Sequence, residues 1–202
     1  MIRLPPPVDA GGKSVYQSLL ARRTTRELST AALTLQQISN ILWAAKGVNR
    51  PSGPFGLPGL TAASASNSQE VDVYVALAAA VYLFDPHECM LRLVVEGDHR
   101  RLALTPGQQH EGPLAPMHLI YVADIDKLAR TKGYQEPHLH DPEFQKAYYF
   151  VDTGLIAANV YLYAASLGLG SWFHNCNQSL KDTLQLGKNQ RVLFAQSVGH
   201  PA

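Results

Sequence analysis

Three arginines and two threonines lie close together near the start of the sequence, in the stretch LLARRTTRELS from Leu19 to Ser29. Arg22, Arg23 and Arg26 offer forked guanidinium donors and Thr24 adds a hydroxyl, a set that suits a phosphate dianion. Cations also favour the carbonyl end of a helix, so the cluster could instead neutralise a helix terminus. This stretch alone leaves both interpretations open.

Two short helices are predicted on either side of this cluster. Ser14 with Gln17, and Thr34 with Gln37, each place a hydroxyl residue three positions before a glutamine, which is typical of a capping box at a helix start. The first helix would therefore lead from Ser14 into the arginines. Residues 1–13 are rich in proline and glycine, and we expect an extended N-terminal arm.

The rest of the chain predicts a sheet with helices packed against it. Apolar or alternating runs indicate strands at 71–77, on both sides of a turn at Asp85–Pro86, at 117–124, after the glycines at 168–170, and at 191–199. One long helix is expected over 152–167. Because most strands lie outside βαβ units, the order indicates an α+β layered fold.

Composition limits the kind of protein. The 202 residues suit one domain, taken as 14–202 with a variable excursion at about 125–149. A net charge of +1 gives no electrostatic basis for nucleic acid or a membrane surface as the main partner. The start of the sequence lacks an apolar leader and the longest apolar run is too short to span a bilayer, so we expect a cytoplasmic protein.

Other chemistries are not indicated by the sequence. The stretch HLHDPE (138–143) could offer metal ligands, but a solvated polar loop is the better interpretation, and we expect no metal site. Cys176 has no evident neighbouring base, so a nucleophilic role is not favoured. The glycines of GPFGLPG and GLG follow helices rather than strands, which excludes a dinucleotide fingerprint.

Four segments together resemble the nitroreductase family of FMN-dependent oxidoreductases, in the branch that includes thiazoline/oxazoline dehydrogenases of peptide-modifying systems. ARRTTRELS resembles the family's Arg-Arg-Ser/Thr-x-Arg, and AASASNSQEVDVYVA resembles its Pro-Ser-Ala-x-Asn-x-Gln-Pro segment. DTGLIAANVYLYAASLGLGSWF resembles its core helix and Gly-Leu-Gly turn, and LQLGKNQRVLFAQSVGHPA its closing motif. The resemblance implies a nitroreductase-like fold with a central, mostly antiparallel sheet flanked by helices.

The resemblance also implies which residues bind the cofactor. Arg22, Arg23, Thr24 and Arg26 match contacts to the FMN phosphate and ribityl chain, and Arg26 matches a cation near the pyrimidine edge of the flavin. A positive charge there would stabilise reduced flavin.

Three further segments match cofactor contacts of the family. Ala63, Ser64, Ala65 and Asn67 match a segment that reaches the flavin of the other subunit, although an ordinary polar turn would have similar residues. Gln108 matches an amide against the pyrimidine ring. Asn175 and Cys176 match the place where backbone N–H groups approach flavin N5.

The function implied by the resemblance is hydride and electron transfer from NADH or NADPH to an organic acceptor, such as a nitroaromatic or quinone, by a ping-pong mechanism in an FMN-binding homodimer. Two alternatives are a flavin-dependent dehydrogenase of a peptide heterocycle and a non-catalytic FMN-binding protein. No side chain is singled out as a general acid or base. The aromatics of the excursion line either a substrate pocket or a core or dimer contact; they are Tyr134, Phe144, Tyr148 and Tyr149.

Overall fold

An antiparallel sheet forms the centre of the structure. The computed structural model describes residues 1–9, 11–109, 113–133 and 137–202, with the backbone alone described at 138 and 139. In this part of the chain, seven strands form one sheet in the order β1-β6-β5-β4-β7-β9-β8, and β2 pairs with β3 separately. The strands are β1 (Ile2–Arg3), β2 (Val48–Arg50), β3 (Gly59–Leu60), β4 (Val71–Ala76), β5 (Ala80–Asp85), β6 (Met90–Glu96), β7 (Met117–Asp124), β8 (Gly170–His174) and β9 (Gln190–Gly199).

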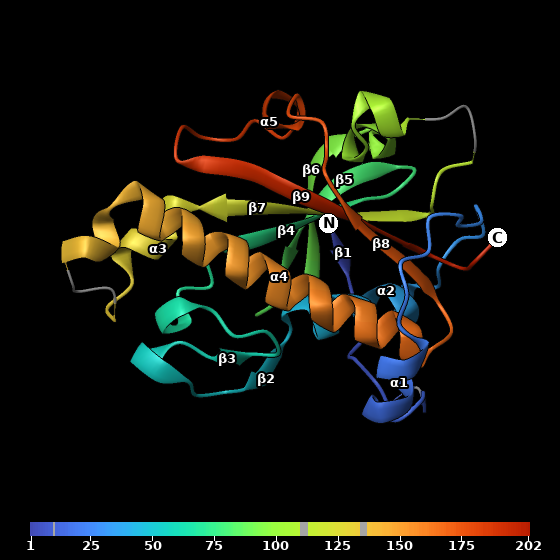
Figure 1. Cartoon of the computed structure of the whole chain (residues 1–202), viewed down its shortest axis with the longest axis horizontal. Coiled ribbons are helices and arrows are strands. Elements are labelled where there is room, and N and C mark those ends of the chain that lie inside the picture. Colours follow the sequence, from blue (N-terminus) through green and yellow to red (C-terminus); the bar gives the residue numbers. More distant parts are fainter. Residues whose placement is uncertain (10, 110–112, 134–136) are drawn as a thin grey trace.

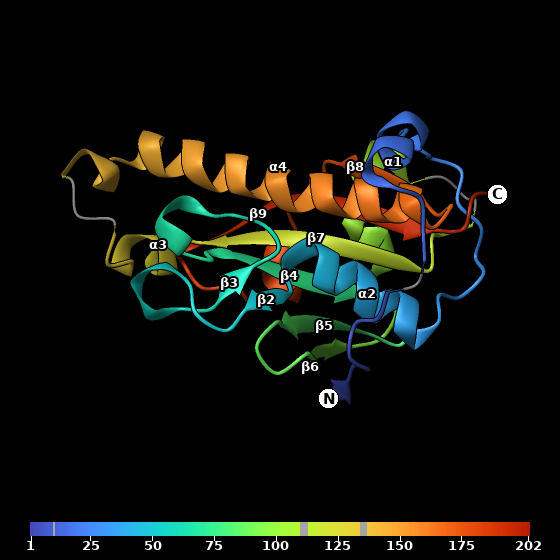
Figure 2. The ribbon, with the colours of Figure 1, turned by 90° about the horizontal axis from the view of Figure 1, so that it is seen from below.

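Helices cover both faces of this sheet, as predicted for an α+β layered fold. The α-helices are α1 (Val15–Ala21), α2 (Leu35–Lys46), α3 (Ile125–Arg130), α4 (Pro142–Ser166) and α5 (Leu180–Thr183). Short 3₁₀ helices are η1 (Pro54–Gly56), η2 (Ala65–Asn67), η3 (Arg100–Ala103), η4 (Pro106–Gln108) and η5 (Pro137–His140). Figure 1 shows α4 crossing one face of the sheet, with α5 on the other side, and Figure 2 shows α1 beside the C-terminal end of α4.

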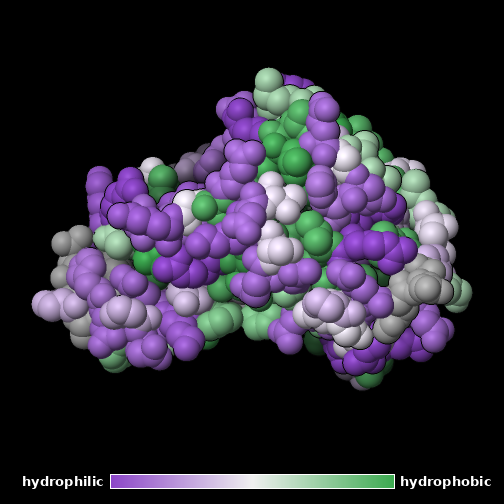
Figure 3. Space-filling model, turned by 90° about the horizontal axis from the view of Figure 1, so that it is seen from above, coloured by the Kyte–Doolittle hydropathy of each residue, from purple (hydrophilic) through white to green (hydrophobic). Residues whose placement is uncertain are grey.

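The core divides into two layers because both faces of the central strands are covered. Val71, Val73 and Val75 of β4 belong to the cluster that also holds α2 and α4 side chains. Tyr74 and Ala76 face the opposite cluster, which includes residues of η3 and α5. Strand β4 is therefore buried along its whole length. Seen from above, over α5 and η3, the surface is mainly hydrophilic, with apolar groups lying between the polar ones (Figure 3).

Both capping boxes predicted from the sequence are confirmed. The Ser14 hydroxyl accepts from the Gln17 N–H at 3.3 Å, and the Ser14 N–H donates to the Gln17 side chain at 3.1 Å. Thr34 and Gln37 make the same reciprocal pair. Ahead of α1, the arm is extended; the Ser39 hydroxyl of α2 donates to the Pro5 carbonyl at 2.5 Å.

The predicted start of the long helix is wrong by ten residues. The sequence indicated 152–167, whereas α4 runs from Pro142 to Ser166. Asp141 caps its start by accepting from the Glu143 N–H at 2.8 Å, and Pro142 occupies the first helical position, where its missing N–H has no consequence. The first turns of α4 face solvent on most sides, so they carry no clean apolar stripe for sequence analysis to detect.

Candidate cofactor site

The arginine cluster lies beyond α1, not in its last turn. Arg22 caps the helix with an extended backbone, and no basic residue lies in the last turn itself. The chain then runs along β8: Thr24 pairs with Ser171, and the Thr25 N–H donates to the Ser171 carbonyl at 2.9 Å. Gly170 permits this approach, because a Cβ there would come within 2.5 Å of the Leu28 side chain. Neutralisation of a helix end therefore accounts for Arg22 alone.

The three guanidinium groups have no acidic partner within the described part of the chain. Among the described residues, none of Arg22, Arg23 and Arg26 forms an ion pair, and all three are exposed. Arg22 lies over the ring of Tyr161 at 5.6 Å, and Arg26 lies over the ring of Trp172 at 5.9 Å. Uncompensated, forked donors of this kind are what a phosphate dianion requires.

Arg22, Arg23, Thr24 and Arg26 together form what we call the arginine corner. A cavity of about 430 Å³ opens beside it. Arg22, Arg23 and Thr25 line it on one side and Tyr161 of α4 on the other. The Tyr161 hydroxyl lies 3.3 Å from the Thr24 hydroxyl, so α4 and the arginine segment meet at one polar contact. Lys13 also lines the cavity and adds a cation that the sequence analysis did not single out.

The segment after β8 lies on the same edge of the sheet as the arginine corner. Strand β8 is one of the two edge strands of the described sheet, and Asn175 and Cys176 follow its last residue. From Ser171 to Asn175, four residues of extended chain span about 13 Å. Burial raises the pKa of the Cys176 thiol to about 11, so it stays protonated at neutral pH and packs in the core beside Leu180. Cys176 thus offers only its backbone here.

Gln108 lies on η4, with its carbonyl oxygen already engaged. It accepts from the Thr105 N–H and from the Thr105 hydroxyl, both at 3.0 Å. Its link to the site is indirect: the Asn177 N–H, in the segment after β8, donates to the Leu102 carbonyl of η3 at 3.2 Å. The structure therefore brings the η3–η4 region against the segment after β8.

The segment with Ala63, Ser64, Ala65 and Asn67 contacts α4 at a different place from the arginine corner. Asp152 accepts from the Ala65 N–H at 2.8 Å, whereas Tyr161 marks the arginine corner nine residues later. Nine helical residues correspond to about 13.5 Å along the helix axis. One chain therefore does not bring this segment and the arginine corner to a single point.

This segment is nevertheless tightly shaped. Ser66, Asn67 and Gln69 all have positive φ, near +50°, a region that side chains rarely adopt and that clusters at functional sites. The Ser64 hydroxyl accepts from the Gln69 N–H at 3.0 Å, and the Asn67 amide donates to the carbonyls of Pro54 and Pro58. Hydrogen bonds at several points therefore hold the backbone of this segment in one conformation.

Two buried ionisable side chains, Lys46 and Asp152, form hydrogen bonds with the backbone of the segment from Ala63 to Gln69. Lys46 donates to the carbonyls of Gln69, at 3.0 Å, and of Val71, and burial lowers its pKa to about 8. Burial, and then the charge of Glu70, raise the pKa of Asp152 to about 7. The sequence analysis missed these residues, since nothing in their spacing indicates that they meet.

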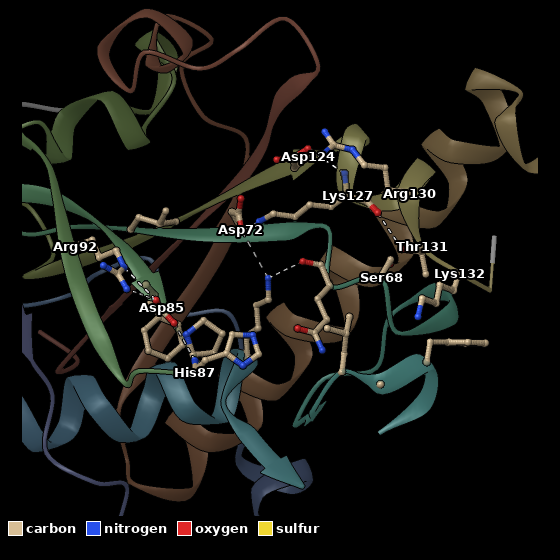
Figure 4. A pocket seen from close by; sticks show the side chains of 18 residues that line it. Ser68, Asp72, Asp85, His87, Arg92, Asp124, Lys127, Arg130, Thr131 and Lys132 are labelled. Carbon is tan, nitrogen blue, oxygen red and sulfur yellow. Dashed lines mark hydrogen bonds and ion pairs between the residues drawn. The ribbon is translucent and has the colours of Figure 1, made fainter. Parts of the chain in front are cut away.

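A second, larger cavity of about 900 Å³ has different electrostatics. It lies between the start of β4, the β5–β6 turn, η1 and α3 (Figure 4). Lys127 pairs with Asp72 at 2.5 Å, and Arg92 pairs with Asp85 at 2.7 Å. Because these cations are already neutralised, this cavity is less suited to a phosphate than the arginine corner is. Lys127, Arg130, Thr131 and Lys132 bring the excursion at 125–149 into its wall.

None of the excursion aromatics that the structure describes, Phe144, Tyr148 and Tyr149, lines either cavity. Phe144 is exposed on α4, and the Tyr149 ring packs against Phe150 at 5.1 Å. Tyr148 is half-buried, and Tyr134 lies outside the described residues. For the three that are described, this placement gives no support to a substrate pocket and leaves the core or dimer contact as the better interpretation.

The described residues offer neither a candidate metal cluster nor a candidate membrane-spanning helix. No group of three or more His, Cys, Asp or Glu side chains there could hold a metal ion. Within the same residues, no helix has both the length and the apolar character needed to cross a membrane.

Comparison with known proteins decides the family. The Nitroreductase family matches residues 19–200, which include the arginine corner, β8 and the segment after it. The chain belongs to the nitroreductase family. This confirms the resemblance described from the sequence, and membership supports an oxidoreductase activity.

Individual nitroreductase relatives agree with this assignment. A candidate nitroreductase of Methanocaldococcus jannaschii, MJ1384, is 32% identical over 160 residues, covering 76% of this chain and 74% of its own. The structure of a candidate nitroreductase from Ralstonia eutropha JMP134 is 33% identical, covers 100% of this chain and 89% of its own, and has a TM-score of 0.85. The NADPH:FMN oxidoreductase of Vibrio harveyi shares the fold at 22% identity, with a TM-score of 0.62, covering 93% of this chain and 68% of its own.

Proposed function

We propose that this nitroreductase-family protein is an FMN-dependent oxidoreductase that passes electrons from NADH or NADPH to an organic acceptor such as a nitroaromatic or quinone. The observation that carries the proposal is a set of three exposed arginines at the edge of the sheet, none of which has an acidic partner among the residues that the structure describes. Their chemistry fits a terminal phosphate, and the backbone after β8 lies further along the same edge.

Different residues would bind different parts of the cofactor. Arg22, Arg23 and Thr24 would bind the phosphate, and Arg26 would place positive charge near the ring system. The backbone at Asn175 and Cys176 would face the flavin. Bound FMN would supply the redox chemistry, so few catalytic side chains are needed. The protonated Cys176 thiol is consistent with that role for the backbone.

Purified protein incubated with FMN is expected to keep flavin absorbance through gel filtration and to oxidise NADH or NADPH with a quinone acceptor. Loss of all flavin on the column would contradict the proposed cofactor. Retention of FMN without any NAD(P)H oxidation would instead support the non-catalytic alternative. Turnover on a heterocycle-containing peptide, but not on a quinone, would favour the peptide dehydrogenase.

We also propose a homodimer, because one chain keeps the two flavin segments apart along α4. Two-fold pairing would let each subunit supply the Ala63–Asn67 segment to its partner's arginine corner. Helix α1 has the surface for such pairing: Val15, Tyr16, Leu19 and Leu20 are 56–73% exposed on seven residues of helix. Clustered exposed apolar side chains mark interaction surfaces.

Leu19→Glu is expected to convert the protein from a two-chain to a one-chain species, because it places a charge in the proposed apolar contact. Sedimentation at micromolar concentration measures the mass, and FMN binding should weaken in parallel. Leu93→Glu, at an exposed leucine of β6, is the control and should leave the dimer intact. A one-chain mass for wild-type protein with FMN still bound would refute the dimer.

A further inference from the structure

A chain of buried polar side chains connects three neighbouring strands and ends beside Asn175. His118 of β7, Ser197 of β9 and His174 of β8 are 1%, 2% and 5% exposed. His118 Nδ1 lies 2.9 Å from Ser197 Oγ, and Ser197 Oγ lies 2.9 Å from His174 Nε2. His174 Nδ1 then lies 2.7 Å from the Asn175 carbonyl oxygen. The registers β7·β9 and β9·β8 bring the three side chains together.

The direction of each hydrogen bond follows from the Asn175 carbonyl. A carbonyl only accepts, so His174 Nδ1 carries the proton and donates. Burial lowers the pKa of both histidines, to about 3 for His118, so each neutral ring carries one N–H. His174 Nε2 therefore accepts from the Ser197 hydroxyl, and Ser197 Oγ accepts from His118 Nδ1. Only this arrangement satisfies all three contacts with neutral rings.

This series of hydrogen bonds fixes the orientation of one peptide group. The carbonyl of Asn175 and the N–H of Cys176 belong to the same trans peptide and point in opposite directions. Because the carbonyl is held by His174, the Cys176 N–H is directed away from His174. Among the described residues this N–H has no hydrogen-bond acceptor. It is therefore a fixed donor that remains available.

We propose that His174, itself held by Ser197 and His118, is a positioning residue that fixes the Asn175–Cys176 peptide so that its N–H is presented to the bound flavin. This inference rests on the proposed FMN function. A donor fixed before binding needs no reorganisation when the cofactor arrives, so it contributes its full interaction. The Trp172 ring lies 4.3 Å from the His174 ring and packs it from the side of Arg26, which further restricts the imidazole.

Two substitutions of His174 separate positioning from general packing. In His174→Asn, the amide N–H reaches the place of Nδ1 and keeps the bond to Asn175, while the bond to Ser197 is lost. In His174→Gln, the amide reaches the place of Nε2 and keeps the bond to Ser197, while the hold on Asn175 is lost. Each variant loses one hydrogen bond, so a purely structural role predicts equal effects from both.

The FMN dissociation constant and the flavin midpoint potential are the measurements. His174→Asn is expected to stay within about threefold of wild type, whereas His174→Gln is expected to bind oxidised FMN about fivefold to tenfold more weakly. Oxidised N5 accepts a hydrogen bond, but reduced N5 carries its own hydrogen. The potential of His174→Gln should therefore rise by about 20–30 mV, where tenfold equals about 30 mV for two electrons.

Equal constants and potentials in the two variants would overturn the inference, provided that wild-type protein binds FMN. If wild-type protein holds no FMN, the proposed function fails instead. Should His174→Gln not fold, ¹⁵N spectra of the wild-type imidazoles decide: the Nδ1–H tautomer of His174 is expected, and the Nε2–H tautomer would overturn the inference.

Discussion

The double variant Arg22→Ala/Arg23→Ala is expected to bind FMN about a hundredfold to ten-thousandfold more weakly than wild type. Each charge-assisted contact to phosphate contributes about 1.5–3 kcal/mol, and every 1.4 kcal/mol corresponds to about tenfold in affinity. Both side chains line the corner cavity, and neither has an acidic partner in the described part of the chain, so their removal leaves no described carboxylate unpaired. Equilibrium titration with FMN, followed by absorbance or fluorescence, measures the change.

Arg130→Ala is the matched control for this prediction. Arg130 lines the larger cavity and pairs with Asp126 at 3.4 Å, so its loss should leave FMN affinity within about twofold of wild type, as for a surface ion pair. The opposite pattern, with Arg130→Ala weakening FMN and the double variant unchanged, would move the cofactor to the larger cavity.

Arg26 should differ from its neighbours in its effect on redox behaviour. It lies over Trp172, further along β8 than Arg22. When saturated with FMN, Arg26→Ala is expected to have a lower midpoint potential than wild type, because positive charge near the ring favours reduced flavin. Arg22→Ala should keep a near-normal potential. Equal potentials in both variants and wild type would reject this role for Arg26.

His118→Asn is expected to make the folding stability of the protein much less sensitive to low pH. Burial, followed by the neighbouring charges of His174 and Arg100, lowers the pKa of His118 from 6.5 to about 3, and Asp98 opposes this. Below pH 6.5 the unfolded chain gains a proton that the folded chain does not. The wild type therefore loses stability as pH falls from 6.5 towards 3, by about 1.4 kcal/mol per pH unit and about 5 kcal/mol in all.

The difference between wild type and variant isolates this effect. Asp152, with its pKa raised from 3.8 to about 7, contributes stability that is lost as pH rises through that window, so its slope opposes that of His118 in the wild type. Urea unfolding of both proteins from pH 8 to pH 4 should show His118→Asn gaining about 3 kcal/mol relative to wild type by pH 4. Ser197→Ala keeps the buried imidazole and should retain the wild-type slope. Parallel curves for His118→Asn and wild type would contradict the prediction.

Local signals in the sequence predicted much of the fold. The two capping boxes, the turn at Asp85–Pro86 and the strand at 117–124 depend on neighbours along the chain, and all appear where expected. The predicted start of α4 was wrong because the first turns of the helix carry no apolar stripe. Asp141 and Pro142 are nevertheless residue types typical of a helix start. The order of the strands was beyond sequence analysis, since pairing partners are far apart in the chain.

From the sequence, the candidate site could be predicted only as a set of residue types, and not as a set of contacts between them. Arg22 and Arg26 were identified from their chemistry, but Tyr161 and Trp172 lie more than a hundred residues later and meet them only through the fold. The same holds for His118 and Ser197, whose contact depends on strand register. Whether the Ala63–Asn67 segment reaches a flavin is a question about a second chain, and remains a prediction.

The route of the arginine segment along β8 has a consequence for aggregation. An edge strand presents unpaired N–H and C=O groups that can template another chain. Here the Thr25 N–H satisfies the Ser171 carbonyl at 2.9 Å, and the Phe173 N–H donates to the Tyr161 hydroxyl at 2.8 Å. The arginine segment and Tyr161 thus also shield the outer edge of β8 from intermolecular strand addition. Loosening this segment is therefore expected to make the protein prone to self-association and to weaken the proposed binding of FMN.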